Sequence, residues 1–457
     1  MAKGALLVLA AFGIQSPYVL YTIHPGVASR ISWRPTTQSM AWCNPSVVGR
    51  KEVVKILLVH NFYGSASPSG ENQAFEVEKA LLAARGHVVA QFTRTSDELR
   101  GGGVLGVARG GLATPWNPWM VSALGRLVAM LRPDVVHVHN TFPLISPGIF
   151  HAIGQQAARV LTLHNYRLFC PGAVPMRDGR PCTECLDRRS SWPAVKHACY
   201  RNSRLATLPL ALSVGVHRML KTWTHEVDAF VALSEFQRWR MAESGLPLHK
   251  VHVKPNFYPG RPPVVPWVER SSYVVFAGRL TVEKGLTYLL QAWQEWGHSA
   301  PELRILGDGE LRSHLTTVAA GLPVRFLGQL SNEEAEAQIA GARLLILPSV
   351  CFEGFPMVLR EAFAFGTPAA VADIGPLPSI VEHGRSGVVF APANPESLLR
   401  EARLAWDTPG LLERLGQGAR REFEARYTEE ANYATLMSIY DKAISVSRSG
   451  GDTRRTS

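Results

Sequence analysis

The 457-residue sequence lacks the short motifs that mark several large protein classes. It has no helix-turn-helix, zinc-finger or RNA-recognition signature, so no nucleic acid partner is expected despite a net charge of +11. The loop after the first expected strand lacks G-x-G-x-x-G, which argues against a dinucleotide-dependent dehydrogenase. No D-x-D pair is placed to bridge a diphosphate through a metal ion. Other groups must therefore carry the chemistry of this chain.

Charged residues are sparse and unevenly distributed. They make up 19% of the chain against 46% hydrophobic residues, which indicates a globular protein with room for two or three domains. Lys and Arg outnumber Asp and Glu by 24 to 14 in residues 51–255, and the balance reverses to 20 against 23 in residues 256–457. The basic first half predicts an acidic partner there, such as lipid headgroups or lipid-linked phosphates.

The first 50 residues contain no Asp or Glu and do not resemble the start of a folded domain. Their apolar runs, residues 4–14 and 18–23, are short and interrupted. We expect an extension that is disordered or not part of the folded protein, with a weak membrane anchor as the alternative.

The most informative stretch is LILPSVCFEGFPMVLREAFAFG, residues 345–366. An apolar run over residues 344–347 predicts a buried strand, and the turn around Gly354 leads into a helix that ends near Gly366. A helix that starts directly after such a turn presents unpaired backbone N–H groups, here those of Met357, Val358 and Leu359. Free donors and the helix dipole together favour a bound phosphate.

Two carboxylates flank this helix start, Glu353 in the turn and Glu361 in the second helical turn. A carboxylate accepts hydrogen bonds from paired hydroxyls, as on a sugar or a ribose. The E-x7-E spacing therefore suits a nucleotide-sugar whose diphosphate lies at the helix end. Two ordinary solvated carboxylates remain the alternative, because this spacing also arises by chance.

The segment EGFPMVLREAFAFGTP resembles the retaining glycosyltransferases of family 4. The resemblance implies an α/β protein with the GT-B fold: two Rossmann-like domains with parallel sheets facing across a cleft. The implied parts are an N-terminal acceptor domain (51–255) with a Cys-containing insertion (168–204), a nucleotide-sugar-binding domain (256–426), a returning helix (427–446) and a disordered tail (447–457).

The resemblance also assigns donor-binding positions in both domains. In the second domain these are Phe355 and Pro356 together with the helix start and Glu361. In the first domain Gly70 stands where the family's loop approaches the donor phosphate, although Ser69 replaces the second glycine that many members have.

Candidate catalytic residues lie at expected strand ends, where α/β proteins bind ligands. His164 follows the strand RVLTLH, and the family resemblance of TLHNYRLFCPG implies contact with the donor sugar; His139 is a second candidate. Arg279 and Lys284 flank a turn that resembles the family's G-R-L-x-x-x-K-G stretch and suit a leaving pyrophosphate. Glu353 is expected to hold hydroxyls of the transferred sugar.

Four cysteines lie close together in the sequence: Cys170, Cys182, Cys185 and Cys199. Their C-x11-C-x2-C-x13-C spacing suits a structural zinc ion with four thiolates, while reduced thiols and disulfides remain alternatives. No metal cofactor is expected in catalysis.

Two further segments allow more than one interpretation. Residues 101–120 are rich in glycine and predict a flexible loop near the acceptor, or a plain connector. Residues 204–223 combine apolar and basic residues at helical spacing, which indicates a core-packing helix or a membrane-surface helix.

The expected function is a metal-independent, retaining, hexosyltransferase-type transfer from a nucleotide-diphosphate sugar to a hydroxyl of a glycan or lipid-linked acceptor. From the family we expect a role in bacterial surface-polysaccharide assembly and a cytoplasmic location, with peripheral contact at the inner membrane face left open. A nucleotide-sugar epimerase and a non-catalytic nucleotide-sugar-binding subunit are the alternatives.

Overall fold

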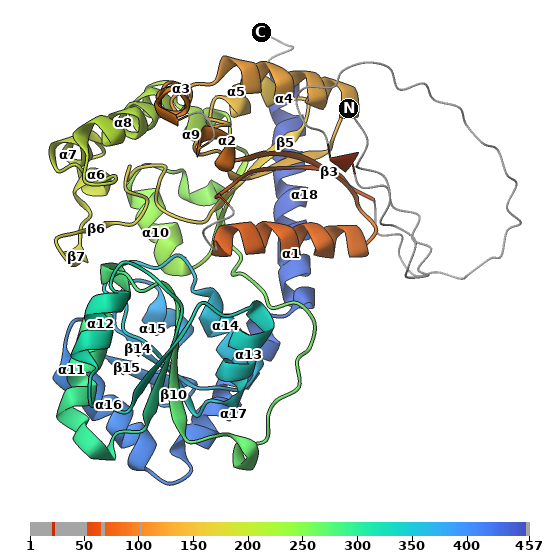
Figure 1. Cartoon of the computed structure of the whole chain (residues 1–457). Coiled ribbons are helices and arrows are strands. Elements are labelled where there is room, and N and C mark those ends of the chain that lie inside the picture. The colour runs from red at the N-terminus through yellow and green to blue at the C-terminus, as the bar shows by residue number, and fades with distance from the viewer. Residues whose placement is uncertain (1–20, 23–52, 65–68, 101–102, 454–457) are drawn as a thin grey trace, which may run out of the picture.

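A computed structural model describes residues 21–22, 53–64, 69–100 and 103–453. Figure 1 shows two lobes, each built on a parallel sheet with helices on both faces. The expected α/β architecture of two Rossmann-like domains is therefore confirmed. The predicted N-terminal extension lies outside the described residues except for β1, which pairs in parallel with β3.

The first sheet has seven parallel strands in the order β1-β3-β2-β4-β5-β8-β9. Every residue of β4, β5 and β8 is buried, as expected of central strands covered on both faces. The strands are β1 (Tyr21–Thr22), β2 (Lys55–Phe62), β3 (Val88–Thr95), β4 (Val135–Asn140), β5 (Ala158–Leu163), β8 (Ala229–Ala232) and β9 (Val251–Val253).

The helices of this lobe include a long α1 and a layer formed around the insertion. The insertion also contains a small antiparallel hairpin, β6 (Met176–Arg177) with β7 (Arg180–Pro181). The helices are α1 (Gly70–Ala84), α2 (Asp97–Arg100), α3 (Gly103–Ala113), α4 (Pro118–Leu131), α5 (Ile149–Ile153), α6 (Glu184–Asp187), α7 (Trp192–Lys196), α8 (Arg204–Met219), α9 (Thr222–His225) and α10 (Glu235–Glu243).

The prediction of a flexible loop over residues 101–120 is wrong. Its described residues, 103–120, form α3, a short connection and the start of α4. Two of its glycines serve close packing: a methyl group at Gly106 would lie 2.4 Å from the Leu99 carbonyl oxygen, and one at Gly110 would lie 2.8 Å from the Leu99 side chain. Glycine here allows two short helices to touch.

The second sheet has six parallel strands in the order β12-β11-β10-β13-β14-β15. The strand order reverses between β10 and β13, so the crevice where such sheets bind ligands lies beyond the carboxyl ends of these two strands. The strands are β10 (Tyr273–Ala277), β11 (Glu302–Leu306), β12 (Val324–Gly328), β13 (Leu344–Leu347), β14 (Ala369–Ala372) and β15 (Gly387–Phe390).

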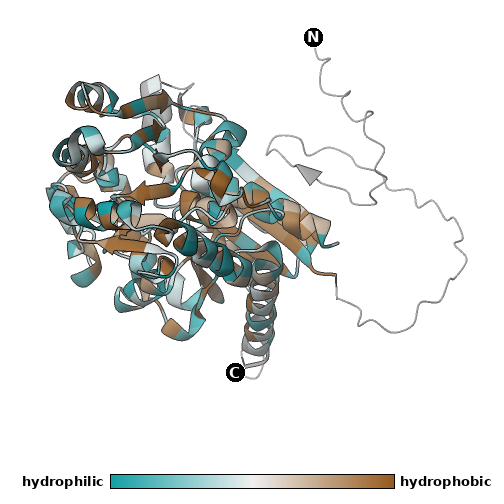
Figure 2. Cartoon of the chain, turned by 90° about the horizontal axis from the view of Figure 1, so that it is seen from below, coloured by the Kyte–Doolittle hydropathy of each residue, from teal (hydrophilic) through white to brown (hydrophobic). Residues whose placement is uncertain are grey.

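Helices cover both faces of this sheet, and hydrophobic strands lie between helices that carry hydrophilic positions in Figure 2. Its apolar core is a single cluster that includes Trp293 and Phe363. The helices are α11 (Leu286–Trp296), α12 (Arg312–Val318), α13 (Asn332–Gly341), α14 (Met357–Ala364), α15 (Leu377–Ile380), α16 (Pro395–Asp407) and α17 (Leu411–Arg426).

The last helix, α18 (Glu429–Thr453), returns to the first lobe (Figure 1). Leu436, Ile439 and Tyr440 join a core cluster with residues of the first sheet. The helix runs past Val446, where a disordered tail was predicted. Hydroxyls of Ser445 and Ser449 donate hydrogen bonds to the carbonyls one turn before them, so these polar side chains have partners within the helix.

Candidate functional site

The centre of the site is an ion pair at the strand reversal of the second sheet. Lys284 Nζ lies 2.7 Å from Glu353 Oε1, which also accepts a 2.7 Å hydrogen bond from the Ser349 hydroxyl. Burial opposes both charges, but the pair overcomes it: the pKa of Glu353 is lowered and that of Lys284 is raised. Both groups are therefore charged at neutral pH.

A glycine fixes the approach of the two chain segments that carry this pair. Gly285 follows Lys284 with φ of +71°, and a methyl group there would lie 1.9 Å from the Pro348 carbonyl oxygen. Only glycine combines this backbone conformation with such close contact. The turn after β10 is thereby held against the loop after β13, which carries Glu353.

Arg279 follows β10 and lies at the rim of the site. Its side chain is 64% exposed, and its guanidinium lies 3.3 Å from Glu283. The positive charge of Arg279 is among the causes that lower the pKa of Glu353. The structure therefore brings Arg279, Lys284 and Glu353 into one region, with Arg279 exposed to a ligand.

Two helix N-termini meet at the same place. Gly70 opens α1 and Met357 opens α14, and a methyl group at Gly70 would lie 3.1 Å from Met357 Cγ. Both helices thus direct the positive ends of their dipoles to the interface between the lobes. The sequence places Gly70 and Met357 on different domains, and the structure joins them.

The predicted set of free amides at α14 needs one correction. The Leu359 N–H donates a 3.1 Å hydrogen bond to the Pro356 carbonyl, so it is not free for a ligand. The amides of Met357 and Val358 lie before the first regular helical bond. Phe355 is buried with its ring 5.3 Å from that of Tyr427, so its side chain packs in the core.

Glu361 lies in the second turn of α14 with its side chain 14% exposed. Burial, followed by the nearby Glu336, raises its pKa, and Arg360 opposes this effect from 3.9 Å. Glu361 does not belong to the Lys284–Glu353 pair, so the two glutamates of the E-x7-E motif occupy chemically different environments.

His164 reaches this region from the first lobe. It directly follows β5, and its carbonyl oxygen would lie 2.8 Å from a methyl group placed at Gly354, the residue after Glu353. Its Nε2 lies 3.1 Å from His139 Nδ1, so both predicted histidines are adjacent. Burial, followed by the charges of His139 and His60, keeps the pKa of His164 well below its usual value.

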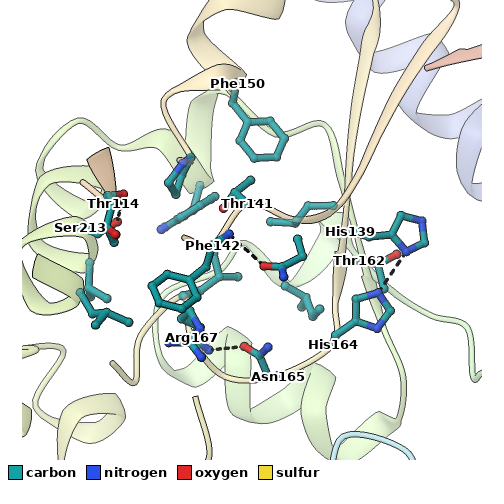
Figure 3. Close-up of a pocket in the computed structure, with 18 residues that line it drawn as sticks. Thr114, His139, Thr141, Phe142, Phe150, Thr162, His164, Asn165, Arg167 and Ser213 are labelled. Carbon is teal, nitrogen blue, oxygen red and sulfur yellow. Dashed lines mark hydrogen bonds between the residues drawn. The ribbon is translucent and has the colours of Figure 1, made fainter. Parts of the chain in front are cut away.

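A cavity opens beside His164 in the first lobe (Figure 3). It contains about 740 Å³ of space not filled by atoms, part of it open to solvent. His139, His164, Asn165 and Arg167 form a polar side, while Phe142, Phe150, Leu210, Val214 and Trp223 form an apolar side that reaches α8. An acceptor with polar and apolar parts would fit this lining.

Several residues at the site were not predicted. Glu71 is half-buried and accepts a 2.7 Å hydrogen bond from Asn165, the neighbour of His164. Glu78, His137 and Lys254 form a buried cluster behind His139. The alternation in VVHVHN on β4 could have indicated part of this cluster from the sequence, because it puts two histidines on one face of a buried strand.

The four clustered cysteines are reduced in the structure. Burial raises the pKa of Cys170 to about 12 and that of Cys185 to about 11, and neighbouring thiols contribute to both shifts. Within the described part of the chain, the ligand atoms of Glu78, His137 and His139 lie within 4.8 Å of one another, and the cysteines form no such group. The Lys254 ammonium, 2.7 Å from Glu78, disfavours a cation in that group.

The sequence matches two family profiles in succession. Residues 71–259 match Glycosyltransferase Family 4, and residues 262–422 match Glycosyl transferases group 1. An uncharacterized glycosyltransferase of Methanocaldococcus jannaschii is 30% identical over 37% of this chain and 45% of the relative. Sulfoquinovosyl transferase of Arabidopsis thaliana is 25% identical over 68% of this chain and 57% of the relative. The chain thus spans about half the length of these curated relatives.

Solved structures share the fold. The crystal structure of Anabaena HepE in complex with UDP and glucose superposes with a TM-score of 0.57 at 16% identity, over 85% of this chain and 100% of that one. At this identity the likeness concerns the arrangement of the two domains.

Proposed function

Because the chain belongs to the family 4 type of GT-B glycosyltransferases, we propose that it transfers a sugar from a nucleotide-diphosphate sugar to an acceptor hydroxyl. One observation carries this proposal. The Lys284–Glu353 pair, the start of α14 and His164 come from both lobes and meet at the strand reversal. The complex of Anabaena HepE with UDP and glucose supports a donor of this class.

The cations of the site suit the leaving diphosphate. Arg279 is exposed beside Lys284, and the Met357 and Val358 amides add dipoles of the same sign. Lys284 has three N–H donors and uses one on Glu353, so donors remain for phosphate oxygens. We propose that these fixed groups balance the developing charge, so that transfer needs no divalent ion.

The reaction is proposed to retain the configuration of a hexosyl donor. The bond from the anomeric carbon to the diphosphate oxygen breaks, the acceptor oxygen bonds to that carbon on the same face, and the acceptor proton passes to the leaving phosphate. Glu353 and His164 orient the sugar from opposite lobes, and Glu361 accepts hydrogen bonds from the ribose. The family resemblance supports retention.

A direct assay tests this function. Purified protein is incubated with UDP-, GDP- and ADP-sugars, with and without a lipid-linked glycan, and products are identified by mass spectrometry. Transfer that requires acceptor and persists in EDTA supports the proposal. Product without acceptor would indicate an epimerase, and restoration of EDTA-inhibited transfer by magnesium or manganese would refute metal independence.

An exposed face of the first lobe fits a lipid surface, in line with a proposed role in surface-polysaccharide assembly on the cytoplasmic face of the inner membrane. On α8, Leu205, Leu212 and Met219 are 83%, 51% and 75% exposed and lie seven residues apart, hence on one helix face. Gly111 of α3 packs near Pro209 in that face, next to the 83% exposed Leu112. We call Leu112, Leu205, Leu212 and Met219 the apolar stripe.

The charge around the apolar stripe indicates which kind of partner would bind it. The segments 101–133 and 188–225, which contain α3 and α8, carry ten Lys or Arg residues and no Asp or Glu. An anionic bilayer complements such a face, because basic side chains add attraction to apolar insertion. None of the helices in the described ranges is long and apolar enough to cross a membrane, so the proposed contact is peripheral.

Vesicle sedimentation tests the lipid contact. We expect binding to vesicles containing anionic lipid, weaker binding at high salt, and loss of binding in Leu212→Glu. Val268→Glu, on an 89% exposed side chain of the second lobe, is the matched control. Equal binding of both variants would refute the proposal, and a dimer that only Leu212→Glu dissociates would identify a second copy as the occupant.

A structural zinc ion on Cys170, Cys182, Cys185 and Cys199 stays a proposal. The shared insertion and the mutual effects on thiol pKa support it; the ligands would have to draw together around the ion. Elemental analysis of purified protein is expected to give one zinc per chain, and none in Cys182→Ser. A zinc-free wild-type protein that is fully folded would refute it.

A further inference from the structure

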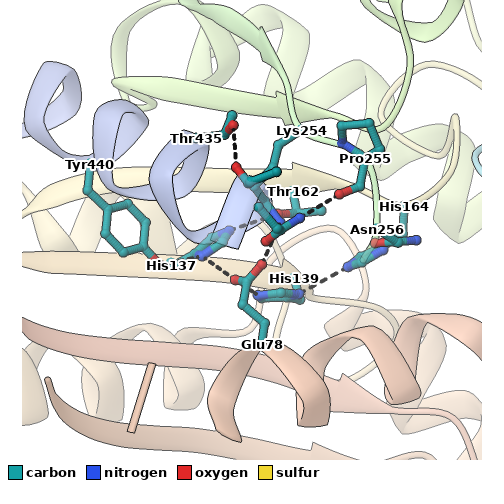
Figure 4. Close-up of polar contacts among 12 residues, drawn as sticks. Glu78, His137, His139, Thr162, His164, Lys254, Pro255, Asn256, Thr435 and Tyr440 are labelled. Carbon is teal, nitrogen blue, oxygen red and sulfur yellow. Dashed lines mark hydrogen bonds and ion pairs between the residues drawn. The ribbon is translucent and has the colours of Figure 1, made fainter. Parts of the chain in front are cut away.

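A buried polar network lies behind His164 and extends across the first lobe (Figure 4). Glu78 of α1 is its centre, with His137 and His139 of β4 on one side and Lys254, directly after β9, on the other. None of the four is more than 4% exposed. Burying four polar or charged groups is costly unless each is paired, so a specific role is expected.

The two oxygens of Glu78 have separate partners. Oε2 lies 2.7 Å from Lys254 Nζ, while Oε1 lies 3.1 Å from His137 Nδ1 and 3.2 Å from His139 Nε2. Burial alone would favour the neutral acid, but Lys254, then His137 and His139, hold the pKa of Glu78 well below its usual value. Glu78 is therefore an ionised carboxylate that only accepts hydrogen bonds.

This fixes the proton positions along the chain of rings. Since Oε1 of Glu78 has no hydrogen to donate, His139 must donate from Nε2. In a neutral His139 the other nitrogen, Nδ1, is then an acceptor, and it faces His164 Nε2 at 3.1 Å. His164 must therefore carry its proton on Nε2, which leaves its Nδ1 with a free lone pair.

Assuming the sugar transfer proposed above, we propose that Glu78 and His139 are positioning residues that hold His164 as the Nε2–H tautomer, so that His164 Nδ1 accepts a hydrogen bond from a hydroxyl of the donor sugar. A protonated His139 would reverse the outcome, because it would donate to His164 Nε2 and turn Nδ1 into a donor. The charge of one buried ring thus decides which groups His164 recognises.

Charged and titratable groups from several elements surround the His139 ring. Its ring lies 4.4 Å from that of His137, 5.2 Å from that of His164 and 6.3 Å from that of His60. Two carboxylates lie near these rings. Glu78 is already paired with Lys254, whose Nζ also donates to Asn432 of α18 at 3.3 Å, and Glu71 interacts with His139 and accepts a hydrogen bond from Asn165. Tyr440 of α18 lies 2.8 Å from His137 Nδ1. The Lys254 ammonium already offsets the charge of Glu78, so Glu71 is the remaining carboxylate among these groups that could offset a charge on His139.

The network is anchored where the lobes join. Lys254 starts the crossover to the second domain, and two residues later the Asn256 side chain contacts Met357 Sδ at 3.3 Å. Asn432 donates a 2.6 Å hydrogen bond to the Pro255 carbonyl. His164 is thus oriented from the same segment that positions the start of α14.

Nuclear magnetic resonance of full-length protein labelled with ¹⁵N-histidine tests the tautomer directly, because protonated and unprotonated ring nitrogens resonate apart. The His164 signals are assigned by their loss in His164→Ala. We expect the Nε2–H tautomer in the wild type at neutral pH. A proton on His164 Nδ1 would overturn the proposal, whether or not the protein transfers sugar.

Variants test the link from Glu78 to His164. Glu78→Gln is expected to direct its carbonyl to Lys254 and its amide to His139, which inverts both tautomers and lowers kcat about tenfold, a typical effect of one misplaced proton or hydrogen bond. The double variant with His164→Ala should lose no more than His164→Ala alone. Additive losses would mean that Glu78 acts elsewhere and would contradict the proposal.

His137→Gln is the matched control. His137 contacts the same Glu78 oxygen but not His164. We expect this variant to lower Tm and leave the His164 tautomer and kcat unchanged. If His137→Gln lowered kcat as much as Glu78→Gln at equal loss of Tm, the network would be merely structural and the proposal would fail.

Discussion

The two lobes contribute to the site in different ways. The second lobe supplies Lys284, Ser349 and Glu353 from two adjacent loops, within one pair of interacting charges. The first lobe supplies His164 through a network that joins α1, β4, the crossover and α18. One half is a local assembly, and the other depends on four separate parts of the chain.

This difference bears on how each half fails. In the second lobe Lys284 and Glu353 form an ion pair, so removal of one of them leaves the other without its partner. His60, His137 and His217 of the first lobe are buried and their pKa values are lowered, so acid is expected to destabilise this lobe. The two halves are therefore expected to respond to different perturbations.

Acid should destabilise the first lobe most. Burial lowers the pKa of His137 and His217 to about 4 and that of His60 to about 3. Below pH 6.5 the unfolded chain binds protons that the folded lobe does not. As pH falls from about 6 to about 4, each histidine removes about 1.4 kcal/mol of stability per pH unit, so the three together remove about 4 kcal/mol per pH unit.

Calorimetry at pH 8, 6 and 5 would measure this loss, with UDP added to mark the unfolding of the second lobe. The described histidines of that lobe, His298, His314 and His383, are exposed. Equal acid sensitivity of both transitions would contradict the proposed contrast between the lobes.

Lys284→Met is expected to lower kcat/KM about 10²–10³-fold, because it removes a fixed cation from the leaving group. It should also lower Tm, since Glu353 then remains buried without its partner. Arg279→Met is the matched comparison: its exposed side chain predicts lost transfer with unchanged Tm. Steady-state rates and thermal melts separate the two, and wild-type turnover by Lys284→Met would remove it from the site.

Glu361→Gln should weaken nucleotide binding more than the chemical step. A hydrogen bond to a charged group contributes about 1.5–3 kcal/mol, so we expect roughly a 10–100-fold higher Kd for UDP by calorimetry. Glu336→Gln serves as control, because Glu336 accepts from Tyr258 at 2.8 Å and has no assigned ligand contact. Equal weakening by both would mean that charge, not ribose contact, is responsible.

Gly354→Ala should have the smallest effect. Its methyl group would lie 2.8 Å from the His164 carbonyl oxygen and push the halves of the site apart. We expect KM for the donor to rise a few-fold with little change in Tm. Gly70→Ala, which meets only the flexible Met357 side chain at 3.1 Å, should change KM less. If Gly70→Ala raised KM more than Gly354→Ala, the tighter contact between the lobes would lie at α1.

The same contrast explains what the sequence revealed. The second half of the site was predictable because its residues lie in two short motifs, and the turn of Gly285 places them side by side. His164 was predictable from its position at a strand end. Its supporting residues were not, since Glu78 and Lys254 are separated by 176 positions and meet only after the sheet and crossover form.

The glycines of residues 101–120 show the opposite limit. Glycine-rich sequence is typical of loops, yet here Gly106 and Gly110 allow α3 to touch Leu99. Whether a glycine makes the backbone flexible or allows two segments to pack closely depends on which residues lie next to it in the folded protein.

The return of α18 makes the folding of the first lobe depend on a segment that follows the second lobe in the chain. Tyr440 completes both its apolar core and the hydrogen bonds of His137. Because α18 follows the second lobe in the chain, the first lobe cannot complete its core until the second lobe has been synthesised. Nascent chains that stop short should therefore depend on chaperones, and domain-dissection experiments should graft α18 onto the N-terminal fragment.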